Sequence, residues 1–417
     1  MRVALLSPLP PEQTGIADYA AHWRRAVQSA GVHVLTPLQG QKPLHSFEAA
    51  RRWVAERDWS KVDVVHAELG GGRHSEFFVL KALAAMPVRP RLSATVHDPE
   101  RLVWRPVSAL WRRLDAVRWL PGAVSKALAV LVDPHTLWTE RRLARRLDGV
   151  VTLTQTGAQR LSRRMKLPPG RVRVIPHGTL PLPTQPLPLL APVRLLYFGF
   201  IYAGKGIEDL VDALGRLRQQ QPELAAQVRL TIAGGTAPDI AFGGRHSYLD
   251  GLRARAASLG LQDQIEWVLD VDERDIPELV GRHHVMVLPY RESRKLALMG
   301  QMRGTSGALA WAVAAGRGVI TSDARAFAEE ISHGNGEAYP QGDVAALTEA
   351  LAGALREPER VAHWARAAQA LSEQRAWSRT GRAFAAYFSA LKTGVSELPD
   401  TALGAPQPAT SSSGGAR

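Results

Sequence analysis

The sequence predicts an α/β protein made of two Rossmann-like, doubly wound domains. Its 417 residues are too many for one ordinary domain and suit two, each able to bury roughly 70 % of its unfolded surface. Short apolar strands alternate with amphipathic helices along both halves, which is typical of parallel sheets covered by helices. A proline-rich stretch at 177–192 separates the halves and indicates a linker, because proline cannot continue a sheet.

Composition narrows the class of protein and of partner. The net charge of +13 favours an acidic partner, which nucleic acid, anionic lipid and a phosphorylated substrate would all satisfy. The absence of cysteine excludes disulfides and thiolate metal sites. No stretch approaches about 18 consecutive apolar residues, and the first residues lack the apolar run of a signal peptide. We therefore expect a soluble protein of the cytoplasm.

The first half opens with a strand at 3–6, a proline-rich turn and a helix that begins near Gly15. Further strands are predicted at 32–35, 62–66 and 92–96. In doubly wound domains the loops that follow the strands lie at the carboxyl edge of the sheet, where ligands bind. The loop at Gly15 is therefore predicted to contact substrate.

Two strands of this half deliver polar side chains at their carboxyl ends, His66 with Glu68 and His97 with Asp98. Histidine beside a carboxylate suits general-base work, because its unperturbed pKa is near 7 and the acid can orient the ring. A structural histidine that bonds a loop carbonyl is the alternative. Metal binding is a further alternative, but no H-x-x-x-H spacing supports it.

Residues 101–148 combine tryptophan and arginine in an unusual way. Trp104, Trp111 and Trp119 recur at about two helical turns and are accompanied by arginines. This pattern describes a helix lying in a membrane interface, and it also fits a pair of helices packed on the sheet with solvated arginines. Stacking on single-stranded nucleic acid is a third reading, although no RNA-binding signature accompanies it.

The second half opens with a strand, a glycine loop and a helix at 193–217. Gly199, Gly204 and Gly206 permit a tight turn and a close approach of the backbone to a ligand, and the loop leads to a helix N-terminus that attracts anions. Lys205 is placed where it could meet a phosphate. The loop is neither a Walker A loop nor G-x-G-x-x-G, so an ordinary strand-to-helix loop with an exposed lysine is the alternative.

A second predicted anion site lies before a helix of small residues. Its backbone N–H groups and hydroxyls belong to Gly304, Thr305, Ser306 and Gly307. A diphosphate would satisfy this site and the Lys205 loop together. Further strands of this half are predicted at 228–235, 265–268, 284–289 and 318–322.

We divide the chain into a first domain at 1–180, a linker at 181–192, a second domain at 193–375 and a final helix at 376–392. The tail at 393–417 is rich in proline, serine and glycine, and we expect it to be disordered.

These pieces together resemble the GT-B glycosyltransferases of the GT4-like family, from the start of the chain to about residue 392. The resemblance rests on the glycine loop at Gly15, RVRVIPHG before the linker, YFGFIYAGKG, SGALAWAVAAGRGVITSD and the terminal helix. It implies two Rossmann-like domains facing a cleft, with a nucleotide-diphosphate sugar on the second domain and the acceptor on the first. It also implies that the last helix crosses back to the first domain, and that neither a metal nor a cofactor is needed beyond the nucleotide sugar as co-substrate.

The resemblance assigns roles to individual residues. Lys205 would stabilise the charge of the departing diphosphate, a contact of roughly 1.5 to 3 kcal/mol. His97 and Asp98 would be catalytic and would face the reacting sugar. The predicted substrate-binding residues are Gly15, His66, Glu68, Gly199, Gly206, Arg303, Gly304, Thr305, Ser306, Gly307, Glu329 and Glu330.

Two departures from the family pattern concern the donor site. Phe200 stands where the family loop usually has arginine, and Arg303 and Trp311 stand at the positions of the E-x7-E carboxylates, which hold hydroxyls of the donor sugar and the ribose. Arg303 could pair with phosphate or with an acidic sugar instead. A replacement carboxylate could come from Glu292, Glu329 or Glu330.

The sequence thus predicts a glycosyltransferase that uses a nucleotide sugar and a glycan or lipid-linked acceptor, with peripheral contact of 101–148 with an anionic membrane and without nucleic acid. Retention of configuration is implied by the resemblance alone. The missing carboxylates favour, as an alternative, a non-catalytic GT-B protein that binds without turnover. A basic nucleic-acid binder is the third hypothesis.

Overall fold

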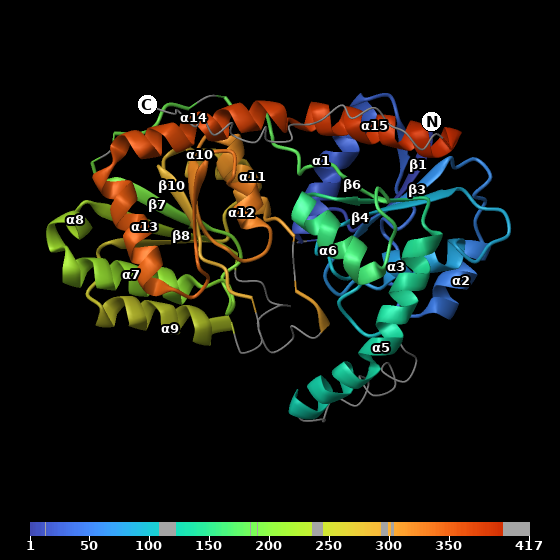
Figure 1. The fold of residues 1–417 in the computed structure, drawn as a ribbon, viewed down its shortest axis with the longest axis horizontal. Coiled ribbons are helices and arrows are strands. Elements are labelled where there is room, and N and C mark those ends of the chain that lie inside the picture. The colour runs from blue at the N-terminus through green and yellow to red at the C-terminus, as the bar shows by residue number, and fades with distance from the viewer. Residues whose placement is uncertain are drawn as a thin grey trace, which may run out of the picture.

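The computed structural model describes residues 1–12, 14–107, 122–183, 185–189, 191–235, 245–292, 299–301 and 304–394, with the side chains of 122–129 and 245–247 left out. Figure 1 shows two α/β lobes side by side, each with one sheet between helices. The predicted fold class, two doubly wound α/β domains, is confirmed.

The first domain is built on a parallel sheet with the strand order β2-β1-β3-β4-β5-β6. Its strands are β1 Arg2–Leu6, β2 His33–Leu35, β3 Val64–Leu69, β4 Arg91–Val96, β5 Gly149–Thr152 and β6 Val172–Val174. The interior strand β3 is buried along its whole length, as expected for a parallel sheet covered on both faces. It extends to Leu69, three residues beyond its predicted end, because it stays paired with β4 as far as Val96, and His66 and Glu68 are therefore buried in the sheet rather than exposed beyond it.

Side-chain caps fix where several helices of this domain begin. Its helices are α1 Gly15–Ser29, α2 Phe47–Ala55, α3 Ser75–Leu83, α5 Gly122–Arg146 and α6 Gln155–Met165. The hydroxyls of Thr14, Ser46 and Thr154 accept backbone N–H groups of the first turns of α1, α2 and α6. The cap at Thr14 fixes the start of α1. The loop between β1 and α1 follows the end of a parallel strand and therefore lies at the carboxyl edge of the sheet.

The second domain has the strand order β12-β11-β10-β7-β8-β9, and all of its pairs are parallel. Its strands are β7 Val193–Phe198, β8 Val228–Gly234, β9 Ile265–Leu269, β10 Val285–Leu288, β11 Gly318–Ser322 and β12 Gly336–Tyr339. From β7 the chain adds β8 and β9 on one side, and then β10, β11 and β12 on the other side. The point between β7 and β10, where the order of strands reverses, is where ligands of doubly wound domains bind. Strand β12 was not predicted, because its sequence GEAY is a short, half-exposed edge without an apolar run.

Helices flank the second sheet and join it to the first domain. They are α7 Ile207–Gln220, α8 Pro222–Ala226, α9 Arg245–Ser258, α10 Ile276–Gly281, α11 Gly307–Ala314, α12 Phe327–Glu330, α13 Val344–Arg356 and α14 Pro358–Gln374, with a 3-10 turn η1 at Glu273–Asp275. Figure 1 shows α14 over the second domain and the next helix, α15 Trp377–Thr393, continuing over the first.

Helix α15 packs against α1 and completes the core on one face of the first sheet. Phe384 and Phe388 are fully buried there, and their rings lie 5.5 and 5.9 Å from the ring of Trp23. The junction before α15 is bonded to the chain just before the linker, because Thr179 N donates to Arg375 O and Trp377 N donates to Thr179 O. The two chain crossings between the domains therefore run together.

The linker is fastened to the second domain by Arg317. This side chain is buried, and its guanidinium donates to the carbonyl oxygens of Gln185, Pro186 and Gly281 as well as to those of its own turn. Burial lowers the pKa of Arg317 to about 10, which leaves it charged at neutral pH. The linker is thus held against the second domain by hydrogen bonds from Arg317, in addition to the stiffness that its prolines give it.

The segment 101–148 contains one long helix, α5, in its described part. Trp104 is half-buried and its indole donates to the carbonyl oxygen of Asp98 at 3.1 Å, so this tryptophan is not on a free surface. Trp111 and Trp119 lie outside the described residues, as do Arg303 and the predicted disordered tail beyond residue 394. No helix of the described segments is both long and apolar enough to cross a bilayer.

Candidate active site

The carboxyl edges of the two sheets meet at the backbone of Gly304. A Cβ atom built on Gly304 would lie 2.1 Å from the carbonyl oxygen of His97 and 3.1 Å from Asp98 Oδ1. Two further bonds join the domains here, from Gln301 N to Glu100 Oε2 at 2.9 Å and from Arg101 to Met299 O at 2.9 Å. The loop after β4 and the loop before α11 are therefore in direct contact.

His97 is held by a buried carboxylate. Its Nε2 donates to Glu68 Oε2 at 2.8 Å, and Glu68 is only 1 % exposed, while the His97 side chain keeps 12 % of its surface. Burial alone would raise the pKa of Glu68, but the hydrogen bonds and charges of His66 and His97 outweigh it and lower the pKa to about 2. With Nε2 bound to Glu68, Nδ1 is the nitrogen of His97 that can accept a proton or a hydrogen bond.

The structure corrects two predicted substrate contacts. His66 is fully buried, its ring nitrogens lie 2.6 Å from Ser93 Oγ and 2.9 Å from Thr95 Oγ1, and Trp23 stacks on its ring. It is a structural histidine, the alternative that the sequence left open. Glu68 is buried as well, so it positions His97 rather than contacting a ligand.

Asp98 bridges the loop that follows β3 and the second domain. Its Oδ2 accepts from Gly71 N at 3.2 Å, and its Oδ1 lies 3.7 Å from a guanidinium nitrogen of Arg325. The ring of Tyr19 on α1 packs edge-on against His97 at 4.6 Å between centroids, so α1 also borders the site. Gly15, the first residue of α1, is exposed, and no atom of the described residues lies within 4 Å of a Cβ added to it.

The loop after β7 brings Lys205 to the switch point of the second sheet. Gly206 has a φ of +66°, and a Cβ there would lie 1.8 Å from the carbonyl oxygen of Pro289, so only glycine lets the loop pack on the end of β10. Gly199 has a φ of +140° and makes the turn at the end of β7. Together these glycines place Lys205 over the second residue after β10.

That residue is Tyr290, and two cations flank its ring. Lys205 Nζ lies 3.7 Å from the ring centroid and the Arg325 guanidinium carbon 5.5 Å from it. The phenol oxygen lies 3.2 Å from Ser306 Oγ, at the start of α11. Burial would raise the pKa of Tyr290, but the charges of Lys205 and Arg325 and the hydrogen bond with Ser306 together lower it.

The first turn of α11 adds to the positive potential. Ser306 is its N-cap residue but its side chain makes no cap bond, and none of the described atoms lies within 4 Å of a Cβ added to Gly307. Thr305, beside it, accepts a bond from Arg325 with its carbonyl oxygen at 3.4 Å. The predicted nest is thus positioned next to Lys205 and Arg325, and the three features form a site suited to an anion with two phosphates.

The candidate replacement carboxylates serve other purposes. Glu330 is buried and pairs with Arg375 at 2.7 Å, so its predicted contact with substrate is wrong. Glu329 accepts Gln155 N and Thr156 N, each at 2.7 Å, and so caps α6 of the other domain. Glu292 Oε1 accepts Arg325 N at 2.9 Å. Trp311 packs against the second core.

Sequence reasoning missed Tyr290 and Arg325. Both lie directly beyond strands, Tyr290 two residues after β10 and Arg325 three residues after β11. A polar residue just past a buried strand is the signal that singled out His97, and it applies equally to these two. Within the segments that the structure describes, no cluster of three or more histidine and acidic side chains is arranged to hold a metal ion.

Two family profiles match the chain, one in each half. The profile described as Glycosyltransferase Family 4 matches residues 2–179, and the profile described as Glycosyl transferases group 1 matches residues 190–371. A D-inositol 3-phosphate glycosyltransferase of Stackebrandtia nassauensis is 29 % identical over 252 residues, which cover 54 % of this chain and 54 % of that protein. The match thus spans about half of the length of that relative.

Solved structures resemble nearly the whole chain. Sucrose-phosphate synthase from Thermosynechococcus elongatus has a TM-score of 0.69 at 18 % identity, over 94 % of this chain and 100 % of that one. HepE from Anabaena, in complex with UDP-glucose, has a TM-score of 0.64 at 17 % identity, with coverage of 94 % and 100 %. At these identities the likeness establishes the two-domain fold alone.

Proposed function

The chain belongs to the group 1 glycosyltransferases of family 4, and from that premise we propose that it transfers a sugar from a nucleoside-diphosphate donor to a glycan or lipid-linked acceptor. One observation carries this proposal: Lys205, Arg325 and the first turn of α11 surround Tyr290 at the switch point of the second sheet. This is the place where doubly wound domains bind phosphorylated ligands.

The diphosphate leaves with the electron pair of its bond to the sugar, and negative charge therefore grows on its oxygens in the transition state. Lys205, Arg325 and the N–H groups of α11 are already oriented around that place, so they stabilise the charge without reorganising. As the diphosphate departs, the sugar carbon gains a bond to the acceptor oxygen, and the proton of that oxygen passes to a base. We assign this role to His97, whose ring is fixed by Glu68 through Nε2 and can take the proton on Nδ1.

The donor to test first carries uridine diphosphate, because the Anabaena neighbour is described in complex with UDP-glucose. We also propose retention of configuration, in line with the family resemblance, and transfer without a metal ion. Lys205 and Arg325 support the latter, since they supply the positive charge that a divalent ion would bring to a diphosphate.

A thermal-shift series tests the donor site. Uridine diphosphate at about 100-fold over its Kd should stabilise the fold by about 2.7 kcal/mol. Lys205→Ala removes a charge-assisted bond of about 1.5 to 3 kcal/mol, and the Kd should rise about 10- to 150-fold. Lys42→Ala, an exposed lysine of the first domain, is the matched control and should leave the shift unchanged.

Transfer is then measured as release of the nucleoside diphosphate from its sugar conjugate over a panel of acceptors. Binding without turnover over the whole panel would favour the non-catalytic alternative. If no nucleoside diphosphate shifts the melting temperature, or if Lys42→Ala weakens binding as much as Lys205→Ala, the assignment of the donor site is wrong.

A further inference from the structure

Helix α5 exposes apolar and basic side chains on its outer face. Leu131, His135, Trp138, Arg142 and Arg145 are all exposed and follow one another at intervals of four and three residues, so they form a single stripe along the helix. Leu131 is 74 % exposed and Trp138 is 56 % exposed, which is unusual for large apolar side chains. The stripe begins apolar and ends basic.

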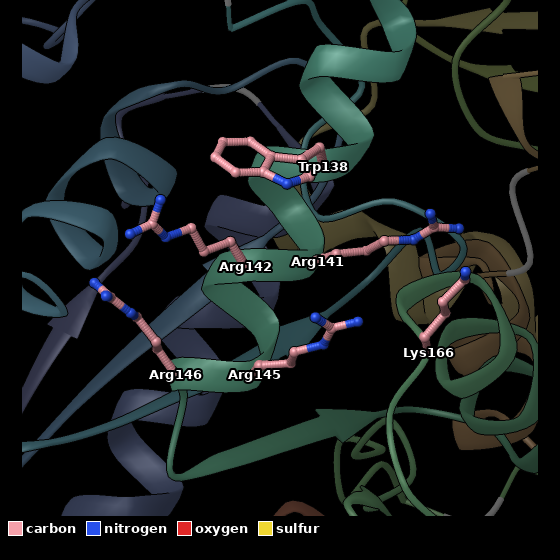
Figure 2. Close-up of a pocket in the computed structure, with 6 residues that line it drawn as sticks. All are labelled: Trp138, Arg141, Arg142, Arg145, Arg146 and Lys166. Atoms are coloured by element: carbon pink, nitrogen blue, oxygen red, sulfur yellow. The ribbon is translucent and has the colours of Figure 1, made fainter.

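Cations gather around the basic end of this stripe. A hollow of about 540 Å³ is lined by Trp138, Arg141, Arg142, Arg145, Arg146 and Lys166. Figure 2 shows Arg142 and Arg146 on one side of α5, and Arg141 and Arg145 on the other side, toward Lys166 at the end of α6. The guanidinium of Arg142 lies 5.5 Å from the ring of Trp138.

The acidic residues of this region are turned inward and already paired. Glu140 and Asp133 bind Arg101, at 2.7 and 2.5 Å, and Asp148 binds Arg89 at 2.6 Å. As far as the structure describes the chain, the five cations of the hollow have no ion pair with a carboxylate; Arg141, for example, donates to the carbonyl oxygen of Arg164. The outer face of α5 is therefore positively charged without compensation.

This arrangement is unfavourable in water alone. Arg141 and Arg145, and likewise Arg142 and Arg146, are like charges one helical turn apart, which destabilises a helix. An anionic surface over the stripe would relieve that repulsion and would also remove Leu131 and Trp138 from water. Basic and aromatic residues could also hold RNA, but the exposed aliphatic residues, Leu131 and the neighbouring Val130 at 41 %, favour lipid.

We propose that the outer face of α5, from Val130 to Arg146 together with Lys166, docks on a membrane surface of anionic phospholipid. Trp138 and Leu131 enter the interface, and the arginines and Lys166 contact the phosphates of the headgroups. This surface lies in the segment 101–148 for which the sequence predicts membrane contact, and it consists of residues other than Trp104, Trp111 and Trp119. The inference rests on the charges and exposure of α5, and it stands apart from the donor site.

Vesicle sedimentation of the full chain tests the proposal. The protein should sediment with vesicles of phosphatidylglycerol and phosphatidylcholine and stay in solution with phosphatidylcholine alone. Arg145→Glu/Arg146→Glu should weaken binding by about tenfold or more, because each cation near an anionic bilayer contributes several-fold. Arg51→Glu/Arg52→Glu is the matched control: it reverses two exposed, consecutive arginines on α2 of the same domain, with the same change in net charge.

The apolar part is tested separately. Trp138→Ala should weaken binding about fivefold or more, since a buried aromatic side chain contributes substantially to interfacial binding. Leu189→Ala, at a linker residue that is 90 % exposed, should have no effect. Equal loss in both double variants, or no loss in Trp138→Ala, would overturn the proposal. So would binding of a homopolymeric RNA more tightly than the vesicles with the same dependence on Arg145 and Arg146.

The uridine diphosphate thermal shift is recorded for every variant. A retained shift in Arg145→Glu/Arg146→Glu shows that the protein is folded and that docking and donor binding are separate. If the wild type shows no nucleotide shift but sediments as described, the proposed function fails and the docking surface stands.

Discussion

Replacing Gly304 with alanine should separate the two domains at the candidate active site. Alanine differs from glycine only by a methyl group, so the change acts through that group and what surrounds it. That methyl group would lie 2.1 Å from the carbonyl oxygen of His97, whereas real Cβ contacts do not fall below 3.0 Å. The neighbour is backbone of the other domain, which cannot rotate away as a side chain would.

The required displacement sets the size of the effect. The loops must move apart by at least about 0.9 Å, the difference between 3.0 and 2.1 Å. A misplacement of about 1 Å between reacting groups can reduce the rate about 100-fold. We therefore expect kcat/KM for release of the nucleoside diphosphate from its sugar conjugate to fall about 100-fold.

Gly251→Ala is the control, because it makes the same substitution at an exposed position of α9 in the second domain, where no described atom lies within 4 Å of the new methyl group. Its rate should equal that of the wild type. Small-angle scattering reports the domain arrangement directly, and Gly304→Ala should be more open with nucleotide bound. A Gly304→Ala protein that is as closed and as active as the wild type would refute the contact between His97 and Gly304 as part of the working state.

Three further predictions concern the groups around the site. The folded protein lowers the pKa of the buried Glu68 to about 2, so its ionised carboxylate stabilises the fold above about pH 4.5, and this contribution is lost as the pH falls toward 2. Glu68→Gln should therefore lower the free energy of unfolding by on the order of 3 kcal/mol at neutral pH. Urea unfolding between pH 2 and pH 7 measures the difference. Glu329→Ala should weaken the contact between the two domains by about 1 to 2 kcal/mol, because the N-terminus of α6 loses the carboxylate that the second domain supplies. Small-angle scattering should show the domains farther apart. Phe388→Ala should lower the free energy of unfolding by about 3 to 5 kcal/mol, because the ring is fully buried in the core under α15.

Each of these three predictions has a control or an outcome that would contradict it. Glu68→Gln and wild type should converge in stability at low pH; parallel curves would mean that Glu68 does not carry the charge. Glu349→Ala, an exposed acid on α13, should not open the domains. Ser389→Ala, next to Phe388 but exposed, should leave stability within about 0.5 kcal/mol, and a cost similar to that of Phe388→Ala would contradict the packing described for α15.

Local sequence signals predicted the architecture well, because strand and helix formation in this fold follows nearby apolar patterns. The β7 strand with its glycines, and the small-residue helix α11, illustrate this. The edge strand β12 was not predicted, because it forms by pairing with β11 and its own composition does not indicate a strand. Glycine at 206 was predictable as a turn residue, but its contact with the carbonyl of Pro289 was not.

The sequence predicted several residues of the site, but it did not predict which of them contact one another. Strand ends pointed to His97 and Asp98, and the glycine loop pointed to Lys205. No local pattern distinguishes His66, which ends up under Trp23 and α15, from His97, which faces the second domain. Likewise Glu329 and Glu330 are neighbours, yet one reaches α6 and the other Arg375. Which side chain meets which is decided by how the two domains come together.

The position of α15 has a consequence for synthesis of the chain. Residues up to about 180 contain every strand of the first sheet, but the face of α1 that carries Trp23 is covered only when Phe384 and Phe388 have been made. At about 5 to 20 residues per second, the intervening stretch of about 200 residues takes roughly 10 to 40 s on the ribosome. Throughout that interval the first domain carries an open apolar face, which makes the nascent chain a candidate for chaperone binding and makes the isolated first domain prone to aggregate unless α15 is supplied with it.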